Sequence, residues 1–382
     1  MTTIEDLRHA AHRRLPGFIA EYLEGGAENE ITLRRNREVF AEHTFVPKML
    51  SGVQSIDTST TLFGRSIPFP VVVAPTGLNG LLTDQGDLHL ASAASSCGVT
   101  FSQSMVSMAM IEAVSQRMHL SSSGTPHWMQ LYVLRDRDFT LHILQRALNA
   151  NCEALLVTVD GPVYGNREWD KRNYIEPTVL DLANKLDVLM HPRWLCDVWR
   201  SGRGPRFVNV EHYTGGKMSH AETAKWLHRE MDASLNWQDI AWLRQHWAGK
   251  LIVKGVMSVD DVARAIDVGA DGVVLSNHGG RQQDLVASPM TVLPAVAAFA
   301  AGRVTVLLDS GIRRGSDIVQ AVAMGADAVM VGRAVLYGLA AGREAGAARA
   351  LQILKEEFTR TMALLGRTSV SELDTTLRGS RF

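Results

Sequence analysis

The chain has 382 residues, of which 46% are apolar and 21% are charged, a composition typical of a globular protein. Its 39 Lys and Arg residues nearly balance 40 Asp and Glu residues, giving a net charge of −1. This balance excludes a generally basic surface for nucleic acid and the strongly charged composition of a disordered chain. Residues 1–14 lack the apolar core of a signal peptide, and the longest stretch without a formal charge, 88–111, carries six serines. We therefore expect a cytoplasmic protein without a membrane span.

The three cysteines, Cys97, Cys152 and Cys196, are widely spaced and form no C-x-x-C pair. This pattern argues against a disulfide framework and against a structural zinc site, so we expect a reducing compartment and no metal.

In chain order, residues 1–50 predict two or three helices, at 4–14, 17–24 and about 29–41, which would cap a barrel or close its mouth. Beyond them, short apolar runs alternate with segments of helical spacing. The eight runs are residues 71–74, 99–102, 128–133, 154–160, 251–254, 272–276, 304–309 and 328–332. The helical segments include residues 138–150, 259–268, 314–324 and 346–365.

These runs are apolar throughout rather than alternating, as strands covered on both faces require. Eight such strands alternating with helices predict an α/β fold of the (β/α)8 TIM-barrel type, with active-site residues at the carboxyl ends of the strands. An open doubly wound sheet fits less well, because no G-x-G-x-x-G follows the first strand.

We expect one domain over residues 1–382, with N-terminal helices in 1–50, the barrel in 51–382, and a long insertion after strand four at about 161–235. An insertion of this length is usually functional or mobile. Its middle, residues 189–207, combines Trp194, Trp199 and Phe207 with four arginines and one aspartate. Such a stretch can lie on an anionic membrane surface, and a folded lid or an oligomer contact fits it equally well.

The last two strands are each followed by glycine and arginine, in VLLDSGIRRGSD (306–317) and AVMVGRAV (328–335). Backbone N–H groups freed by glycine, a helix N-terminus and an arginine fork together form a phosphate site after strands seven and eight. We expect the phosphate to belong to a cofactor fixed on top of the barrel.

Strand six ends in LSNHGGRQQD (275–284), which places His278 and Arg281 three residues apart on a glycine-containing turn. This pair suits a base beside a carboxylate-binding guanidinium. Strand four contributes Asp160 and then Arg167, and a buried aspartate can orient an imidazole and stabilise its protonated form.

Strand five ends in Lys254, a cation that is costly to bury unless it meets an anion. Strand three contributes Gln130 and Tyr132, alternate residues that share one face.

The motifs SNHGGRQ (276–282), DSGIRRGSD (309–317), VKG (253–255) and APTG (74–77) resemble those of the FMN-dependent L-2-hydroxy acid oxidases and dehydrogenases. The resemblance runs from residue 15 to the final helix. TGLNG (76–80), HPRW (191–194) and MDASLNW (231–237) are most similar to the membrane-associated (S)-mandelate branch, and QLYVLRDRDF (130–139) is similar to the bacterial L-lactate branch. The resemblance implies FMN as cofactor, an electron acceptor as partner, and a homotetramer.

By position, the resemblance makes His278 the base for the substrate hydroxyl, with Asp160 as its partner. It places Arg281, Arg167 and Tyr22 at the substrate carboxylate, Tyr132 near the reacting hydroxyl, and Lys254 at the edge of the flavin where negative charge appears on reduction. The residues implied to hold the isoalloxazine and ribityl chain are Thr76, Gly77, Ser104, Gln130, Thr158 and Ser276. Those implied at the ribityl and phosphate end are Asp309, Gly311, Arg313, Gly332 and Arg333.

Two positions bear on substrate and acceptor. Val106 stands where short-chain glycolate oxidases resemble one another in having tryptophan, which predicts more room above the flavin. Gly77 stands where oxygen-using members often have alanine, which favours a quinone or another non-oxygen acceptor. We expect an aromatic 2-hydroxy acid such as mandelate, with L-lactate dehydrogenase or an oxygen-using oxidase as alternatives.

Two rival interpretations share the phosphate loops. A nucleotide-oxidising barrel dehydrogenase would need a cysteine nucleophile at the barrel top, where none is predicted. A non-catalytic flavin-binding barrel would have lost the His, Arg and Asp set, which is present in full.

Overall fold

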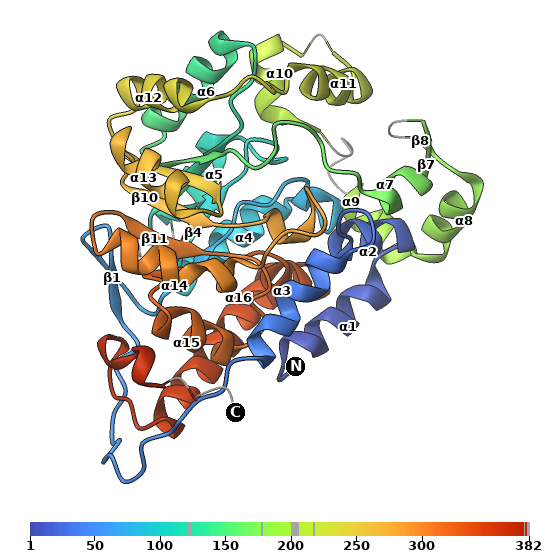
Figure 1. Cartoon of the computed structure of the whole chain (residues 1–382). Helices are drawn as coiled ribbons and strands as arrows, with labels where there is room; N and C mark the ends of the chain where they lie inside the picture. The colour runs from blue at the N-terminus through green and yellow to red at the C-terminus, as the bar shows by residue number, and fades with distance from the viewer. Residues whose placement is uncertain (121–123, 177–178, 200–205, 217, 378, 380–382) are drawn as a thin grey trace.

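A computed structural model describes residues 1–120, 124–176, 179–199, 206–216, 218–377 and 379, and its centre is a closed barrel of eight parallel strands (Figure 1). The eight strands overlap the eight predicted runs, and β12 closes the barrel by pairing with β3, so the predicted (β/α)8 fold is confirmed. In barrel order the strands are β3 (Val71–Val73), β4 (Thr100–Gln103), β5 (His127–Leu131), β6 (Ala154–Thr158), β9 (Lys250–Val256), β10 (Gly272–Leu275), β11 (Thr305–Leu308) and β12 (Ala328–Val331).

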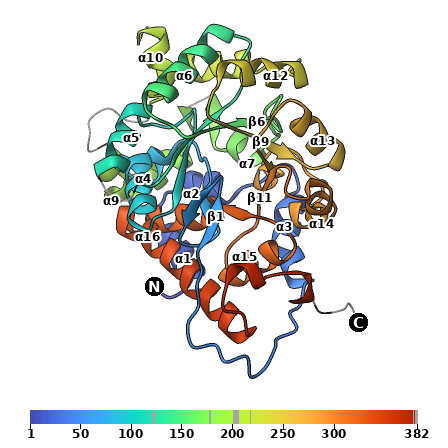
Figure 2. The same ribbon diagram turned by 90° about the vertical axis from the view of Figure 1, so that its left-hand side faces the viewer.

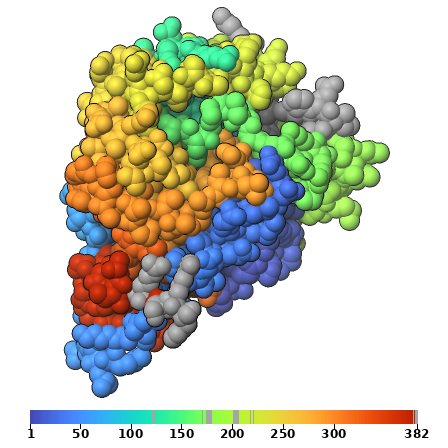
Figure 3. Space-filling view, in the orientation of Figure 1, coloured from blue at the N-terminus to red at the C-terminus, as the bar shows by residue number. Residues whose placement is uncertain are grey.

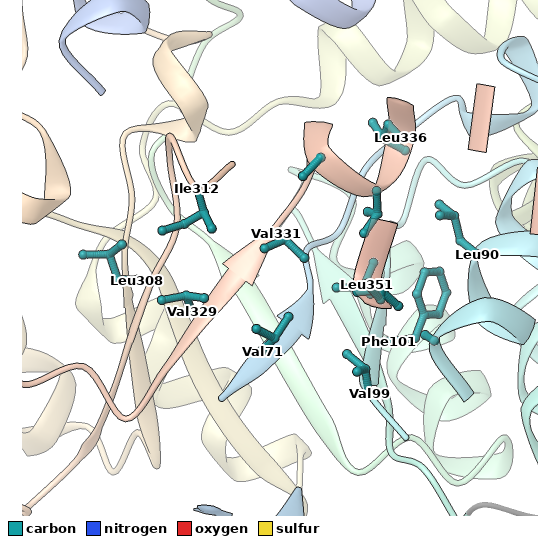
Figure 4. Packing of buried hydrophobic residues seen from close by; sticks show 14 of the residues in the cluster. Val71, Leu90, Val99, Phe101, Leu308, Ile312, Val329, Val331, Leu336 and Leu351 are labelled. Carbon is teal, nitrogen blue, oxygen red and sulfur yellow. The ribbon is translucent and has the colours of Figure 1, made fainter. Parts of the chain in front are cut away.

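The strands are apolar along their whole length because both faces of each strand are buried. On β3, Val72 points into the barrel, whereas Val71 and Val73 belong to the outer core beneath the helices. Figure 4 shows Val71 and Val331 facing the α16 residue Leu351 in this outer layer.

An antiparallel hairpin that the sequence reading did not predict, β1 (Thr60–Leu62) and β2 (Arg65–Ile67), packs against the inner core of the barrel. Phe63 at its turn contacts Trp128 edge-on at 5.7 Å between ring centroids.

The outer helices follow the strands, and Figure 2 shows them surrounding the barrel. They are α4 (Gly86–Ser96), α5 (Ile111–Leu120), α6 (Arg137–Asn149), α12 (Trp237–His246), α13 (Val259–Asp267), α14 (Pro289–Ala300), α15 (Gly315–Ala323) and α16 (Arg333–Leu364). α16 begins earlier than the predicted 346–365 and is interrupted by non-helical backbone at Gly342 and Arg343.

The N-terminal helices α1 (Ile4–Arg14), α2 (Gly17–Glu24) and α3 (Ile31–Ala41) agree with prediction. The buried Asp284 accepts hydrogen bonds from the backbone N–H groups of Ile31 and Thr32 at the start of α3. The turn that carries Arg281 is thereby tied to the N-terminal helices.

The insertion after β6 contains α7 (Glu168–Arg172), β7 (Tyr174–Glu176), β8 (Val179–Leu180), α8 (Leu182–Met190), α9 (Pro192–Val198), α10 (Val208–Thr214) and α11 (His220–Glu230). Its aromatic residues do not share one surface: Trp194 and Phe207 are buried, whereas Trp199 is exposed. Trp194 Nε1 donates to Leu81 O at 2.8 Å, so this part of the predicted membrane-facing stretch is core. Two of its four arginines, at positions 200 and 203, lie outside the described residues.

Among the described residues, no helix combines the length and the apolar character needed to cross a membrane.

Candidate active site

The carboxyl ends of the barrel strands surround a cavity of about 680 Å3. All but two of the residues predicted to form the site line this cavity. The two exceptions lie one hydrogen bond behind the lining, because Asp160 binds His278 and Ser276 binds Lys254.

His278 is held by a carboxylate from another strand. Its Nδ1 lies 2.9 Å from Asp160 Oδ1, and its Nε2 lies 3.5 Å from the hydroxyl of Tyr132. Burial alone would raise the pKa of Asp160, but the charges of His278 and Lys254 outweigh burial and hold this pKa below its ordinary value. Asp160 therefore stays ionised and fixes the imidazole so that Nε2 is the nitrogen available for proton transfer.

The backbone around these two groups depends on glycine. Gly255 has φ +107°, and a Cβ there would lie 2.6 Å from Asp160 Cβ. His278 itself adopts a left-handed conformation, with φ 58°, and its N–H donates to Ser276 Oγ at 3.0 Å. A non-glycine residue held in this region marks a position that the surrounding structure enforces, as is common at functional sites.

Lys254 meets the anion that its burial requires. Its Nζ lies 2.8 Å from Asp309 Oδ2 and donates to Ser276 Oγ at 2.7 Å. Burial alone would lower the pKa of Lys254, but the charges of Asp309 and Asp160 raise it above its ordinary value. The cavity therefore contains a fixed positive charge at the end of β9.

Two further guanidinium groups line the cavity near His278. Arg281 stacks on the Tyr22 ring at 5.0 Å and donates to the carbonyl oxygens of Tyr22 and Gly25 at 2.8 Å each. Arg167 donates to Gln282 Oε1 at 3.1 Å and to the carbonyl of Arg281 at 3.2 Å. This arrangement places two cations beside the imidazole, which suits an anionic substrate.

Arg313 and Arg333 also line the cavity. Arg333 is half-buried and donates to the carbonyl oxygens of Leu23, Gly25 and Gly279, and it shares the Gly25 oxygen with Arg281. Both burial and the charge of Arg313 lower its pKa. The sequence predicts Arg333 only as a phosphate ligand, whereas its guanidinium also ties α2 to the turn that carries His278. Neither Arg313 nor Arg333 forms an ion pair with a carboxylate among the described residues. Two such cations together favour the binding of an anion.

Buried polar side chains of the cavity lining are already ordered by hydrogen bonds to one another. Gln130 accepts hydrogen bonds from Ser104 Oγ and Met105 N, and its amide donates to Thr158 Oγ1 at 3.0 Å. A cavity of this volume, lined by Lys254, by the guanidinium groups and by these ordered amide and hydroxyl groups, fits the ring, polyol chain and phosphate of FMN.

Several lining residues come from the insertion and were not found by sequence reasoning. The ring of Tyr164 stacks on His228 with 4.8 Å between centroids. The residues of the insertion that line the cavity are Val163, Tyr164, Arg167, Phe207, Ala224, Lys225, Leu227, His228 and Met231. Ala224, Lys225, Leu227 and His228 belong to α11 and carry no motif, since only the folding of α11 brings them to the cavity.

None of the three cysteines lines the cavity, so it offers no thiol nucleophile for the nucleotide-oxidising alternative.

Comparisons with known proteins agree with this geometry. A family model described as FMN-dependent dehydrogenase matches residues 11–378. The chain is 41% identical to an L-lactate dehydrogenase of Allorhizobium ampelinum over 376 residues, covering 98% of both chains. It is also 41% identical to an L-lactate dehydrogenase of Chromohalobacter salexigens, covering 98% of this chain and 95% of the relative.

Among solved structures, the monotopic membrane protein (S)-mandelate dehydrogenase superimposes with a TM-score of 0.94 at 40% identity, covering 100% of both chains. Mandelate oxidase with (S)-4-hydroxymandelic acid gives a TM-score of 0.83 at 31% identity, covering 100% of this chain and 99% of the other.

Proposed function

The chain belongs to the FMN-dependent dehydrogenase family, and from that premise we propose that it oxidises an aryl L-2-hydroxy acid such as (S)-mandelate to the 2-oxo acid. Electrons then pass to a quinone or another non-oxygen acceptor. The observation that carries this proposal is the His278–Asp160 pair beside Arg281 and Arg167 in one cavity.

In the proposed reaction, Arg281 and Arg167 bind the substrate carboxylate and so orient the 2-hydroxyl toward His278. Nε2 of His278 takes the hydroxyl proton, because Nδ1 is engaged by Asp160. The ionised Asp160 stabilises the imidazolium, and the Tyr132 hydroxyl lies beside the same nitrogen. Bound FMN supplies the acceptor for the two electrons and the α-hydrogen.

The same cavity would hold FMN through two groups of lining side chains, one for the ring and one for the phosphate. Lys254 supplies a positive charge for the electron-rich edge of the ring, and Ser276 and Asp309 hold that lysine in place. Arg313 and Arg333, with the backbone at Gly311 and Gly332, supply the phosphate end. A Cβ at Gly311 would lie 2.0 Å from Asn36 O, so this close backbone approach requires glycine.

An aryl substrate is supported by the apolar side chains that Val106 and the insertion, with Leu227 and Met231, contribute to the cavity. L-Lactate is the second candidate, because the relatives at 41% identity are L-lactate dehydrogenases. The deciding experiment measures kcat/KM for (S)-mandelate and L-lactate with one artificial acceptor, together with oxygen consumption. We expect mandelate to be preferred and oxygen consumption to be slow. A strong preference for L-lactate, or rapid oxygen use, would contradict this assignment.

We further propose that α8 rests on a membrane surface as a peripheral contact. Leu182, Leu186, Leu189 and Met190 recur at helical spacing and are each more than half exposed, and α8 has no buried residue. Asp187, by contrast, turns toward the body of the protein and accepts from Gly17 N. In Figure 3 this segment projects at the right-hand edge of the molecule. An exposed apolar stripe on a short helix is typical of interfacial rather than spanning helices.

The test is sedimentation with anionic vesicles. Leu186→Glu/Leu189→Glu should lower the bound fraction at least tenfold and leave turnover with a soluble acceptor unchanged. Leu364→Glu alters an equally exposed leucine on α16 and serves as control. Equal vesicle binding by all three proteins would refute the contact.

We also propose that residues 1–382 work as one unit and assemble as a homotetramer. Val46, Met49 and Leu50 are exposed on the loop that projects at the bottom of Figures 1 and 2. The same chain has a separate apolar groove of about 410 Å3, lined in part by Pro294, Val322 and Leu373. A projection on one copy that fills a groove on the next is a heterologous contact, and a quarter-turn between successive copies closes four of them into a ring. Light scattering after size exclusion should give four chains for the wild type and fewer for Leu50→Asp. A monomeric wild type would exclude the tetramer.

A further inference from the structure

Two buried polar residues beneath the β3–α4 loop have no part in the mechanism above. Asn79 begins the short 3-10 helix η1 (Asn79–Leu81), and Asp87 lies in the first turn of α4. Both are 1% exposed, and neither lines the cavity. Asp87 forms no ion pair in the described part of the chain, and its two carboxylate oxygens accept from Asn79 Nδ2 at 2.7 Å and Met108 N at 2.9 Å.

These contacts determine which way the Asn79 amide points. A carboxylate only accepts hydrogen bonds, so the amide nitrogen of Asn79 must face Asp87. That nitrogen also donates to Thr76 O at 2.9 Å, and the amide oxygen accepts from Thr76 Oγ1 at 2.9 Å. The carboxylate of Asp87 thus fixes both polar groups of Thr76 through one intermediate side chain.

The direction of the Thr76 carbonyl has a consequence for Gly77. The Thr76–Gly77 peptide is trans, so the carbonyl of Thr76 and the N–H of Gly77 point in opposite directions. The carbonyl points at Asn79, away from the cavity, and the N–H of Gly77 is therefore directed into the cavity that both residues line. In the described part of the chain this N–H donates to no protein acceptor.

We propose that Asn79 and Asp87 are positioning residues that aim the Gly77 N–H at an acceptor atom of the bound flavin ring. This inference rests on FMN occupying the cavity and not on the identity of the hydroxy acid. The pair acts through Thr76 and touches neither substrate nor flavin. The Asp87 carboxylate, the Asn79 amide and the Thr76 carbonyl can all be hydrogen-bonded in only one arrangement, because the carboxylate and the carbonyl are both acceptors.

A charge-swapped double variant separates this role from ordinary stabilisation of the loop. In Asn79→Asp/Asp87→Asn, residue 79 still accepts from Thr76 Oγ1 and residue 87 still accepts from Met108 N. The bond between positions 79 and 87 also survives with its direction reversed. The donor to Thr76 O is lost, and a carboxylate oxygen of residue 79 faces that carbonyl in its place. A purely structural pair would therefore be largely restored, whereas a positioning pair would not.

The readouts are FMN affinity of the apoprotein, the long-wavelength absorption band of the bound flavin, and thermal unfolding, all measured without hydroxy acid. Failure of substrate oxidation therefore leaves the test intact. We expect the double variant to unfold within a few degrees of the wild type, to bind FMN roughly 3- to 10-fold more weakly, as for one lost hydrogen bond, and to show a shifted absorption band.

Asp84→Asn changes a carboxylate of the same loop and should keep wild-type values. A double variant with wild-type FMN affinity and absorption would overturn the proposal. If the double variant does not fold, Asp87→Asn is compared by the same readouts. That change removes the acceptor-only group that orients Asn79, and an unchanged flavin spectrum with unchanged affinity would likewise overturn it.

Discussion

Replacing Asp160 by asparagine tests the central pair of the proposed site. The change keeps the size of the side chain and an oxygen that can accept from His278 Nδ1, but it removes the negative charge 2.9 Å from the imidazole. The imidazolium that forms when His278 takes a proton then has no counter-charge.

The expected loss follows from the geometry. A hydrogen bond to a charged group contributes about 1.5–3 kcal/mol, which corresponds to roughly 10- to 150-fold in rate. Complete loss of general-base catalysis would cost about 10²–10⁴-fold. We therefore expect kcat to fall by about 10²-fold with little change in KM, because Arg281 and Arg167 remain in place.

The assay is the anaerobic rate of flavin reduction by (S)-mandelate in a protein that retains its FMN. Asp327→Asn is the control, since the Asp327 carboxylate accepts a hydrogen bond from Val306 N before β12 and Asp327 does not line the cavity. Its turnover should match the wild type. A fall of less than tenfold in Asp160→Asn, with FMN bound, would refute the proposed role of the carboxylate.

The pH dependence gives a second check on the same pair. The charges of His278 and Lys254 hold the pKa of Asp160 below its ordinary value, so this carboxylate is ionised wherever an ordinary aspartate is ionised. An acid limb of the turnover profile at a pH where ordinary aspartates are ionised cannot arise from Asp160, and Asp160→Asn should retain it.

Three other predictions concern glycine positions and a buried acid. Gly255→Ala should lower the free energy of unfolding by about 1–3 kcal/mol and abolish turnover, because φ +107° disfavours a side chain and the new methyl meets Asp160; urea unfolding measures the loss, and wild-type stability would contradict it. Gly77→Ala should lower kcat/KM for mandelate, because the new Cβ would lie 2.6 Å from Val106 Cγ2. Adding Val106→Ala should partly restore kcat/KM. The absence of any restoration would show that the clash is not the cause. Burial raises the pKa of Asp87 to about 6, so the wild type should lose about 2 kcal/mol of stability between pH 4 and 7, as the proton that favours the folded state is released. Asp87→Asn should remove this slope in urea unfolding at the two pH values, and an unchanged slope would refute the assignment.

The sequence by itself determined the strands and the groups at their ends. Strands buried on both faces must be apolar throughout, so each of the eight strands could be recognised from its own residues alone. Because parallel strands end at one face, the residues following those runs had to meet there. His278, Lys254 and Arg313 were placed in this way, with FMN implied by the resemblance of their motifs.

Only the tertiary structure decided which of these groups touch. His278 pairs with Asp160 across 118 positions, and Lys254 on β9 meets Asp309 beyond β11, two strands along the barrel. The α11 side chains over the cavity, and Asn79 and Asp87 beneath Gly77, carry no local signature. The spacing of apolar residues in the sequence shows which side chains are buried, because burial follows the regular repeat of a helix or a strand. A contact between distant segments depends on how the whole chain packs, and that information is spread over every element of the barrel.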